Sequence, residues 1–215
     1  MTRTRILAEF AATTPTDGIP AEVSSRALAL ATDLIGSCIR AANEADSSPS
    51  ILAMVERLGF GGDGPCTVFG LNRRYGAAAA ALLNGAFGHS LDFDDTHADS
   101  SLHPSAPVVP AAIAAAELAD ASGAELVAAI VVGFEVCCRL GMALDPTAHY
   151  ARGFHPTATA GTFGAAAAAG RLLGLDATAM ENAFGVAASQ ASGSLQFLEN
   201  GAWNKRYQVG EAAMK

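Results

Sequence analysis

The sequence AAAAALLNGAFGHSLDFDDTHADSSLHPSAPVVPAAIAAAE, residues 77–117, places a dense polar segment between two alanine-rich runs. Alanine has the highest helix propensity, so we predict one helix from about Arg74 to Asn84 and another from about Val108 to Asp120. Pro107 and Pro110 are compatible with the second helix if they fall in or before its first turn. The two runs therefore predict a pair of helices joined by a polar connection.

The polar connection, residues 89–104, is unusual in so apolar a chain, and burying unpaired charge costs several kcal/mol per group. Leu91 and Phe93 alternate with the acids and are expected to draw the segment inward. Two arrangements remain open: a continued helix with one polar face, or a loop that starts at Gly88, in which Pro104 makes His103 extended. The acids are Asp92, Asp94, Asp95 and Asp99, the imidazoles are His89, His97 and His103, and the face of the continued helix would hold His89, Asp92, Thr96 and His103.

The rest of the chain also predicts helices, which gives an all-α fold class. A capping box at Ser122 and Glu125 and an N-cap at Asp176 mark two of the starts. Cys66 to Phe69 is predicted as a brief extended piece, and Asp145 to Phe154 as a loop. The remaining predicted helices run over Arg3 to Thr13, Ala21 to about Ala42, Ser50 to Leu58, Glu125 to about Met142, Thr157 to Leu173 and Asp176 to about Ala191, with a last one beginning near Gly210.

Composition limits the class of protein. The chain has 215 residues, of which 51% are hydrophobic and 16% charged, so it can bury a full core as one domain. It predicts neither disorder, nor a membrane span, nor a signal peptide. A net charge of −8 argues against a nucleic-acid partner. The cysteines Cys38, Cys66, Cys137 and Cys138 have no metal-binding spacing and are predicted to be buried free thiols in a reducing cytoplasm.

Two later motifs add cationic groups. His155, in the motif Gly-Phe-His-Pro-Thr, is expected at a helix entrance, where free amides favour an anion. Lys205 and Arg206 follow a glycine-bearing loop in NGAWNKRYQVG. Taken singly, His155 can be a structural residue and Lys205 and Arg206 a solvated surface pair. Together with the polar segment, they predict an anion site that handles proton transfer.

Four blocks of the sequence resemble the MmgE/PrpD family: LNGAFGHSLDFDDTH, HPSAPVVPAAIAAAE, GFHPTATAGTFGAAAAAGRLLGLD and GAWNKRYQVGEAA. The resemblance implies an all-helical larger domain, a smaller α/β lid domain that this chain lacks, and a homodimer. Residues 1–215 would then be a single, incomplete helical domain, the N-terminal half of a longer two-domain protein. It also implies acid/base chemistry without metal or cofactor on a small di- or tricarboxylate, as in dehydratases, decarboxylases and epimerases of this family.

The resemblance also assigns candidate site residues. The family's acidic motif matches Asp92 and Thr96, the two histidine-proline blocks match His103 and His155, and the last block matches Lys205. We expect His103 and His155 to act as acid and base, without knowing which is which, because a neutral imidazole titrates near pH 7. Lys205 would hold a carboxylate, Asp92 would orient an imidazole, and Thr96 would donate a hydrogen bond. The expected substrate-binding residues are His97, Arg206 and Ser105.

Two alternatives remain. A metal-dependent hydrolase could use His89, Asp92, Asp95 and His97, because imidazole and carboxylate suit zinc, manganese or iron. The other alternative is an inactive helical half that needs a lid domain or a partner chain and exposes apolar surface where that part docks. The identity of the carboxylate, and the choice among dehydration, decarboxylation and epimerisation, are not determined by the sequence.

Overall fold

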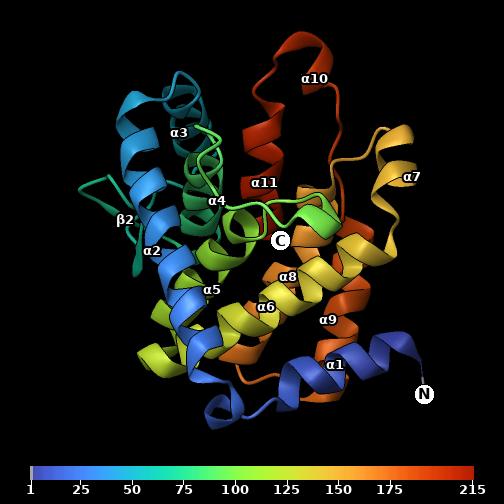
Figure 1. Ribbon diagram of the computed structural model, residues 1–215. Coiled ribbons are helices and arrows are strands. Elements are labelled where there is room, and N and C mark those ends of the chain that lie inside the picture. The colour runs from blue at the N-terminus through green and yellow to red at the C-terminus, as the bar shows by residue number, and fades with distance from the viewer. Residues whose placement is uncertain (1) are drawn as a thin grey trace.

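The computed structural model describes residues 2–215, and within them the all-α prediction is confirmed (Figure 1). The only strands in this range are two short ones, which pair antiparallel. The elements are α1 (Arg3–Thr13), η1 (Thr16–Gly18), α2 (Ala21–Glu44), α3 (Ser48–Arg57), β1 (Cys66–Thr67), β2 (Arg74–Tyr75), α4 (Ala77–Gly88), η2 (Ala98–Ser100), α5 (Ser105–Ala119), α6 (Gly123–Ala143), α7 (Pro146–Ala151), α8 (Pro156–Leu172), α9 (Ala177–Gln190), α10 (Phe197–Asn200) and α11 (Asn204–Met214).

The centre of the molecule is a group of alanine-rich helices, in which α4, α5 and α11 pack on one another, α8 packs on α5 and α11, and α6 packs on α8. A helix that is apolar all round must be buried, and residues 79–88 of α4 are all buried. Glycines allow close approach: a Cβ on Gly210 of α11 would lie 2.3 Å from the Leu82 carbonyl oxygen of α4. The α4–α11 contact therefore fixes where the start of α11 lies relative to the end of α4.

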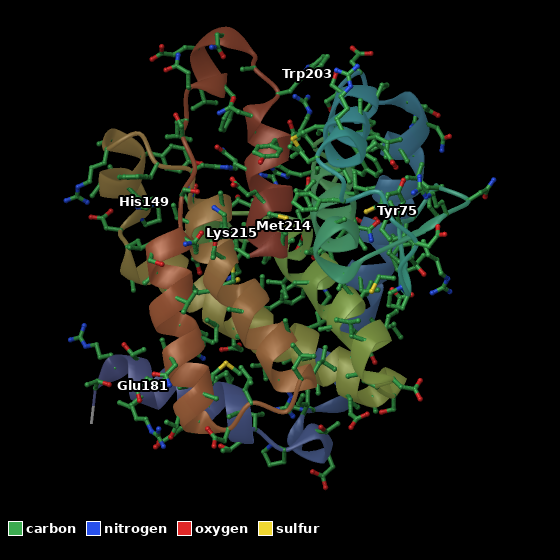
Figure 2. The ribbon with its side chains drawn as sticks, turned by 180° about the vertical axis from the view of Figure 1, so that it is seen from behind. Tyr75, His149, Glu181, Trp203, Met214 and Lys215 are labelled. Carbon is green, nitrogen blue, oxygen red and sulfur yellow. The ribbon has the colours of Figure 1, made fainter. Side chains whose placement is uncertain are left out.

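The ends of several helices follow their local sequence. The capping box predicted at Ser122 and Glu125 is present, and the side chain of Asp176 accepts hydrogen bonds from the first turn of α9. At the other end of α9, the ammonium of Lys215 donates to the Gln190 carbonyl oxygen over 2.8 Å. Figure 2 shows Lys215 beside Met214 at the end of α11. The Asp176 cap is internal to α9, whereas the Lys215 contact ties the end of α9 to the end of α11.

Some predicted boundaries were wrong. Arg74 does not begin α4, because Arg74 and Tyr75 pair with β1 instead. The predicted loop at 145–154 contains α7, for which Asp145 provides the N-cap. Pro110 lies inside α5 rather than in its first turn. Helix α3 begins at Ser48, ahead of the predicted Ser50, and α11 begins at Asn204, ahead of Gly210.

The polar segment 89–104 is a loop, so the continued-helix arrangement is wrong. Helix α4 ends at Gly88, and His89 takes the C-cap position. A short bridge then pairs His97 with Leu102 around η2. Phe93 does not turn inward, since its side chain is 62% exposed. The second predicted arrangement, a loop, is therefore the one observed, and some of its polar side chains point into the protein.

Within residues 2–215, α6 alone is long and apolar enough by composition to cross a membrane. It packs on α8, α5 and α2, and 44% of its most apolar window is buried. A core helix passes the same composition test.

The four cysteines are free; Cys38, Cys66 and Cys137 are buried and Cys138 is half-buried, as predicted for unpaired thiols.

Candidate active site

Three imidazoles and one carboxylate form what we call the histidine cluster: His89, Asp94, His103 and His155. They come from the end of α4, the polar loop and the N-cap of α8. The ring centroids of His89 and His103 are 4.8 Å apart, and those of His89 and His155 are 5.9 Å apart. Residues separated by up to 66 positions in sequence thus meet at one point, as the packing of α4, α5 and α8 requires.

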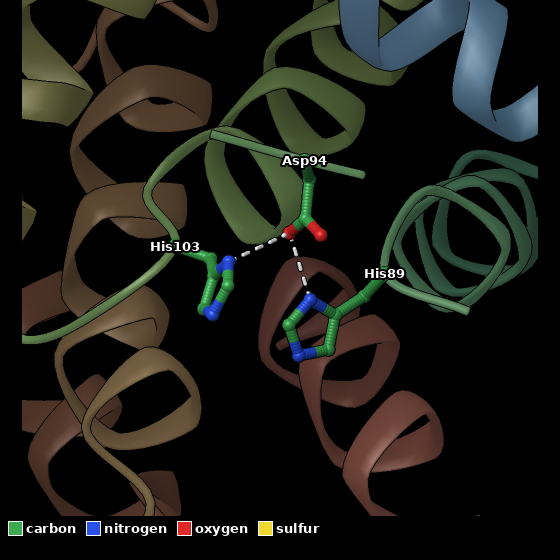
Figure 3. Close-up of side chains that lie close together, drawn as sticks. All are labelled: His89, Asp94 and His103. Atoms are coloured by element: carbon green, nitrogen blue, oxygen red, sulfur yellow. Dashed lines mark hydrogen bonds and ion pairs between the residues drawn. The ribbon is translucent and has the colours of Figure 1, made fainter. Parts of the chain in front are cut away.

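Asp94 is the centre of the cluster. Its Oδ2 accepts a hydrogen bond from His89 Nδ1 over 2.7 Å and lies 3.5 Å from His103 Nδ1 (Figure 3). The side chains of His89 and Asp94 have no exposed surface, whereas that of His103 is 23% exposed. A buried carboxylate beside two imidazoles can fix their orientation and stabilise a proton on either ring.

Several polar atoms of this region are buried without a hydrogen-bond partner among residues 2–215. They include His89 Nε2, Asp94 Oδ1 and His103 Nδ1, together with the hydroxyl of Ser105. Leaving such groups unpaired costs about 1–3 kcal/mol each, so native folds rarely tolerate them in number. A concentration of such groups at one place is typical of a binding or catalytic site.

His103 is held by its backbone as well. Its amide N–H donates to Thr157 Oγ1 over 3.1 Å, which ties the loop to the first turn of α8. Burial lowers the pKa of His103 below its usual range, although Asp94 acts in the opposite direction. A neutral imidazole that is partly open to solvent is a suitable proton acceptor at neutral pH.

His155 lies deeper and is only 3% exposed. Its Nδ1 is 2.7 Å from the side-chain nitrogen Nε2 of Gln208 on α11. Its ring lies edge-on to that of Phe197, with the ring centroids 5.1 Å apart. Burial, helped by the neighbouring His89 and Lys205, lowers the pKa of His155 to about 2. His155 is therefore a neutral imidazole across the physiological range of pH.

Lys205 lies in the first turn of α11, and its ammonium forms an ion pair with Asp92. The Lys205 nitrogen also lies 5.8 Å from the centroid of the Phe197 ring. Asp92 has a φ of 55°, a left-handed conformation that few residues other than glycine, asparagine and aspartate adopt readily. Burial alone would raise the pKa of Asp92, but the hydrogen bond and charge of Lys205 outweigh it and lower that pKa.

The other predicted site residues lie around this cluster. Arg206 Nε donates to the Ser90 carbonyl oxygen over 3.0 Å, and the Ser105 amide donates to Asp95 Oδ1 over 3.1 Å. His97 is occupied by the Ser100 hydroxyl, 2.7 Å from its Nδ1. Thr96 is exposed, and its hydroxyl has no hydrogen-bond partner among residues 2–215. The structure thus joins His103, His155, Lys205 and Asp92 into one region and leaves Thr96 and His97 at its edge.

Sequence reasoning placed Asp92 against an imidazole, a contact that Asp94 makes instead. It also missed Gln208, whose amide contacts His155. The only sequence signal for Gln208 was its helical spacing of three residues from Lys205, which puts both on neighbouring parts of one helix face.

The metal-ligand set predicted from sequence is not gathered. Asp92 pairs with Lys205, Asp95 binds the start of α5, and His97 bonds Ser100. In the part of the chain that the structure describes, the group of potential ligands that does converge is His89, Asp94 and His103, with ligand atoms within 4.8 Å of one another. Within residues 2–215, His89, Asp94 and His103 therefore replace the predicted set as the candidate metal ligands.

Comparison with known proteins identifies the family. The sequence model of the MmgE/PrpD N-terminal domain matches residues 5–215. The chain is 38% identical over 186 residues to a cis-aconitate decarboxylase-like protein of Aspergillus oryzae, covering 83% of this chain and 38% of that protein. It is 36% identical over 212 residues to cis-aconitate decarboxylase of Aspergillus terreus, covering 96% of this chain and 42% of that one.

The human cis-aconitate decarboxylase is 40% identical over 116 residues, which is 52% of this chain and 24% of the human protein. The chain thus spans less than half the length of these relatives. The match of the family domain nevertheless runs through the polar loop, the start of α8 and the start of α11, where the histidine cluster and Lys205 lie. This chain belongs to the MmgE/PrpD family.

Proposed function

We propose that the chain carries the acid/base site of a lyase that moves a proton at the carbon next to a carboxylate of a small di- or tricarboxylate. The observation that supports this most is the meeting of His89, His103 and His155 around Asp94, beside Lys205, with polar atoms that have no partner among residues 2–215. The names of the relatives make cis-aconitate the first substrate to test and decarboxylation the first reaction.

His103 is the group proposed to move the proton: it accepts one from carbon in dehydration or epimerisation, and its protonated form delivers one to carbon when carbon dioxide leaves. It is the most exposed ring of the three that contact one another, and its neutral form is favoured by burial. Asp94, 3.5 Å from its Nδ1, would stabilise the imidazolium that forms when Nε2 takes a proton. General acid/base groups of this kind contribute roughly 10²–10⁴-fold to a rate.

Lys205 is the proposed anchor for the substrate carboxylate. Its ammonium has three N–H donors, and Asp92 accepts from one of them, so donors remain for a ligand. Negative charge grows on the carboxylate side of the substrate when the carbon loses its proton or carbon dioxide. A fixed cation in a partly buried site stabilises that charge without reorganising.

The wider predictions attach to the same proposal. Chemistry without a cofactor, homodimerisation, a cytoplasmic location and substrate contacts from Thr96, His97, Arg206 and Ser105 stay predictions. Epimerisation and dehydration begin with removal of a proton from carbon, whereas decarboxylation needs a proton delivered to carbon, and both remain alternatives to decarboxylation.

Deuterium incorporation tests the proposal. The longest polypeptide that the gene encodes is incubated in D₂O with citrate, 2-methylcitrate, cis-aconitate and aspartate-derived diacids, and proton NMR follows exchange and conversion. We expect one acid to exchange or react, and His103→Ala to abolish this, while Asp99→Asn in the same exposed loop leaves it unchanged. Near-normal turnover by His103→Ala and Lys205→Ala would refute the scheme.

A metal-assisted reaction is the second candidate, because His89, Asp94 and His103 can converge on one ion. Elemental analysis after exhaustive chelation, followed by addition of zinc, manganese or iron, separates the two. Exchange that survives chelation favours the imidazole mechanism, whereas exchange that returns only with one metal favours the alternative.

A further inference from the structure

The amide of Gln208 has a defined orientation. Gln208 Oε1 accepts a hydrogen bond from the Ser194 amide over 2.9 Å, and its Nε2 donates to the Ser194 carbonyl oxygen over 3.1 Å. A backbone N–H can only donate and a carbonyl can only accept, so the two ends of the side-chain amide cannot be exchanged. Gln208 therefore presents its NH₂ group, and not its oxygen, to its remaining neighbour.

That neighbour is His155. The Gln208 nitrogen lies 2.7 Å from His155 Nδ1, and an amide NH₂ offers only hydrogen atoms. His155 Nδ1 must therefore accept, which means that it carries no proton. A neutral imidazole with a bare Nδ1 has its proton on Nε2, and an imidazolium, protonated on both nitrogens, would place two N–H groups against each other.

The surroundings hold this contact in place. The His155 amide donates to the Gly193 carbonyl oxygen over 3.1 Å, and the Leu195 amide donates to the Gly153 carbonyl oxygen over 2.9 Å. Gly193 has a φ of +141°, and a Cβ there would lie 2.7 Å from the Ala158 Cβ. The segment around Ser194 is thus held against the start of α8. Because Gln208 is hydrogen-bonded to Ser194, its side-chain amide keeps a fixed orientation relative to the ring of His155.

We propose that Gln208 is a positioning residue that keeps His155 neutral with its proton on Nε2, so that His155 donates a hydrogen bond to a substrate oxygen instead of taking the substrate proton. The role toward substrate rests on the proposed function. It leaves His103 as the group that moves the proton. The tautomer itself depends only on the contacts of Gln208 and Ser194 with His155.

The first test is the tautomer of the unaltered protein. The protein is labelled with ¹⁵N-histidine, and long-range proton–nitrogen correlation assigns both ring nitrogens of His155, identified by the signals that His155→Gln removes. We expect Nε2 at the shift of a protonated nitrogen and Nδ1 at that of an unprotonated one from pH 5 to pH 8. A protonated Nδ1 at pH 8 would overturn the proposal without any variant of Gln208.

The second test changes the partner. In Gln208→Glu a carboxylate faces Nδ1, so we expect Nδ1 to become protonated at pH 8, while Gln190→Glu, which adds the same charge on the exposed end of α9, leaves the His155 shifts unchanged. An unprotonated Nδ1 in a folded Gln208→Glu protein would contradict the proposal. For Gln208→Glu we expect kcat to fall roughly 10²-fold with little change in KM. This is the scale seen when one hydrogen-bond donor to a developing oxyanion is lost.

The two proposals fail separately. An Nε2–H tautomer in a protein that exchanges no acid refutes the proposed function and leaves the role of Gln208 in setting the tautomer intact. A working enzyme whose His155 carries its proton on Nδ1 refutes the positioning role and leaves the proposed function standing. A kcat unchanged in Gln208→Glu, with Nδ1 protonated and Nε2 unprotonated, would refute hydrogen-bond donation by His155 as a catalytic contribution.

Discussion

The glycine- and alanine-packed core and the histidine cluster lie next to each other and follow opposite rules. In the core, small residues let α4 and α11 approach until a Cβ on Gly210 would overlap the α4 backbone. In the cluster, large polar rings meet around Asp94 and leave several buried atoms unpartnered within residues 2–215. The core is arranged for close packing, whereas the cluster retains groups that reduce stability, as binding and catalytic sites often do.

The two regions nevertheless depend on each other. Lys205 and Gln208 reach the cluster only because α11 lies against α4, and that contact requires glycine at 85 and 210. A Cβ on Gly85 would lie 2.9 Å from the Gly210 Cα. Changes in the cluster should therefore reduce activity with little effect on folding, and changes in the core should reduce stability first.

The largest effect should come from Asp94→Asn. The change keeps the size of the side chain and removes the charge that faces His89 and His103. We expect kcat to fall by roughly 10²–10⁴-fold, because the imidazolium formed during proton transfer loses its stabilising partner. Turnover of the acid identified by deuterium incorporation is the measurement.

Asp99→Asn is the matched control. Asp99 is exposed in the same loop, so this variant makes the same aspartate-to-asparagine change outside the histidine cluster. Thermal unfolding of both variants shows whether the loss is one of function alone. Equal turnover in Asp94→Asn and Asp99→Asn would remove Asp94 from the mechanism and weaken the contrast between the two regions.

The second effect is on the core. In Gly210→Ala the added methyl would meet the Leu82 carbonyl oxygen at 2.3 Å and the Ala86 amide nitrogen at 2.9 Å. Backbone atoms cannot move aside cheaply, so we expect the free energy of unfolding to fall by about 3 kcal/mol or more. Urea denaturation measures it. A loss under about 0.5 kcal/mol, the usual size for a surface change, would show that α4 and α11 are not held at this distance.

Much of this arrangement could be predicted from local sequence. The ends of α1, the capping box at Ser122 and the N-cap at Asp176 each depend on residues a few positions apart, and all agree with the structure. His155 was also predicted at the entrance of α8, where it is the N-cap residue, although its side chain makes no capping hydrogen bond. Short-range hydrogen bonding explains the caps at Ser122 and Asp176.

The failures involve contacts between distant residues. Arg74 was assigned to a helix because its pairing with Thr67 is not visible in the local composition. Asp92 and Asp94 cannot be distinguished by spacing, since the left-handed backbone at Asp92 determines which acid meets the imidazoles and which meets Lys205. Gln208 contacts His155 only after α11 has packed on α4 and α8. These contacts depend on tertiary geometry, which the pattern of residue types does not contain.

The third prediction concerns pH. The pKa of His155 is lowered to about 2, chiefly by burial, whereas in the unfolded chain it is about 6.5. Below pH 6.5 the unfolded state therefore binds a proton that the folded state does not, so stability is lost as the pH falls. Between pH 7 and pH 4.5 this one group should remove about 2–3 kcal/mol from the free energy of unfolding.

His155→Gln isolates this contribution, because it stays neutral and can still accept a hydrogen bond from Gln208. The difference between the two proteins in the free energy of unfolding, measured by urea denaturation at pH 7 and pH 4.5, removes the effects of Asp92, Asp95 and the other titrating groups. Identical pH dependence in the two proteins would mean that His155 becomes protonated in the folded state, and its burial in the cluster would then be much looser than the structure indicates.

The smallest expected effect comes from a second glycine substitution. Gly185 lies within α9, and a Cβ there would have no heavy atom within 4 Å, in contrast to Gly210. Gly185→Ala should therefore stabilise the protein by about 0.5–1 kcal/mol, because alanine loses less conformational freedom than glycine on entering a helix. Urea denaturation alongside Gly210→Ala compares one substitution in two surroundings. Helix propensity alone predicts stabilisation at both positions, so a loss at Gly210 and a gain at Gly185 would measure steric exclusion between α4 and α11. Equal destabilisation of the two variants would contradict this interpretation.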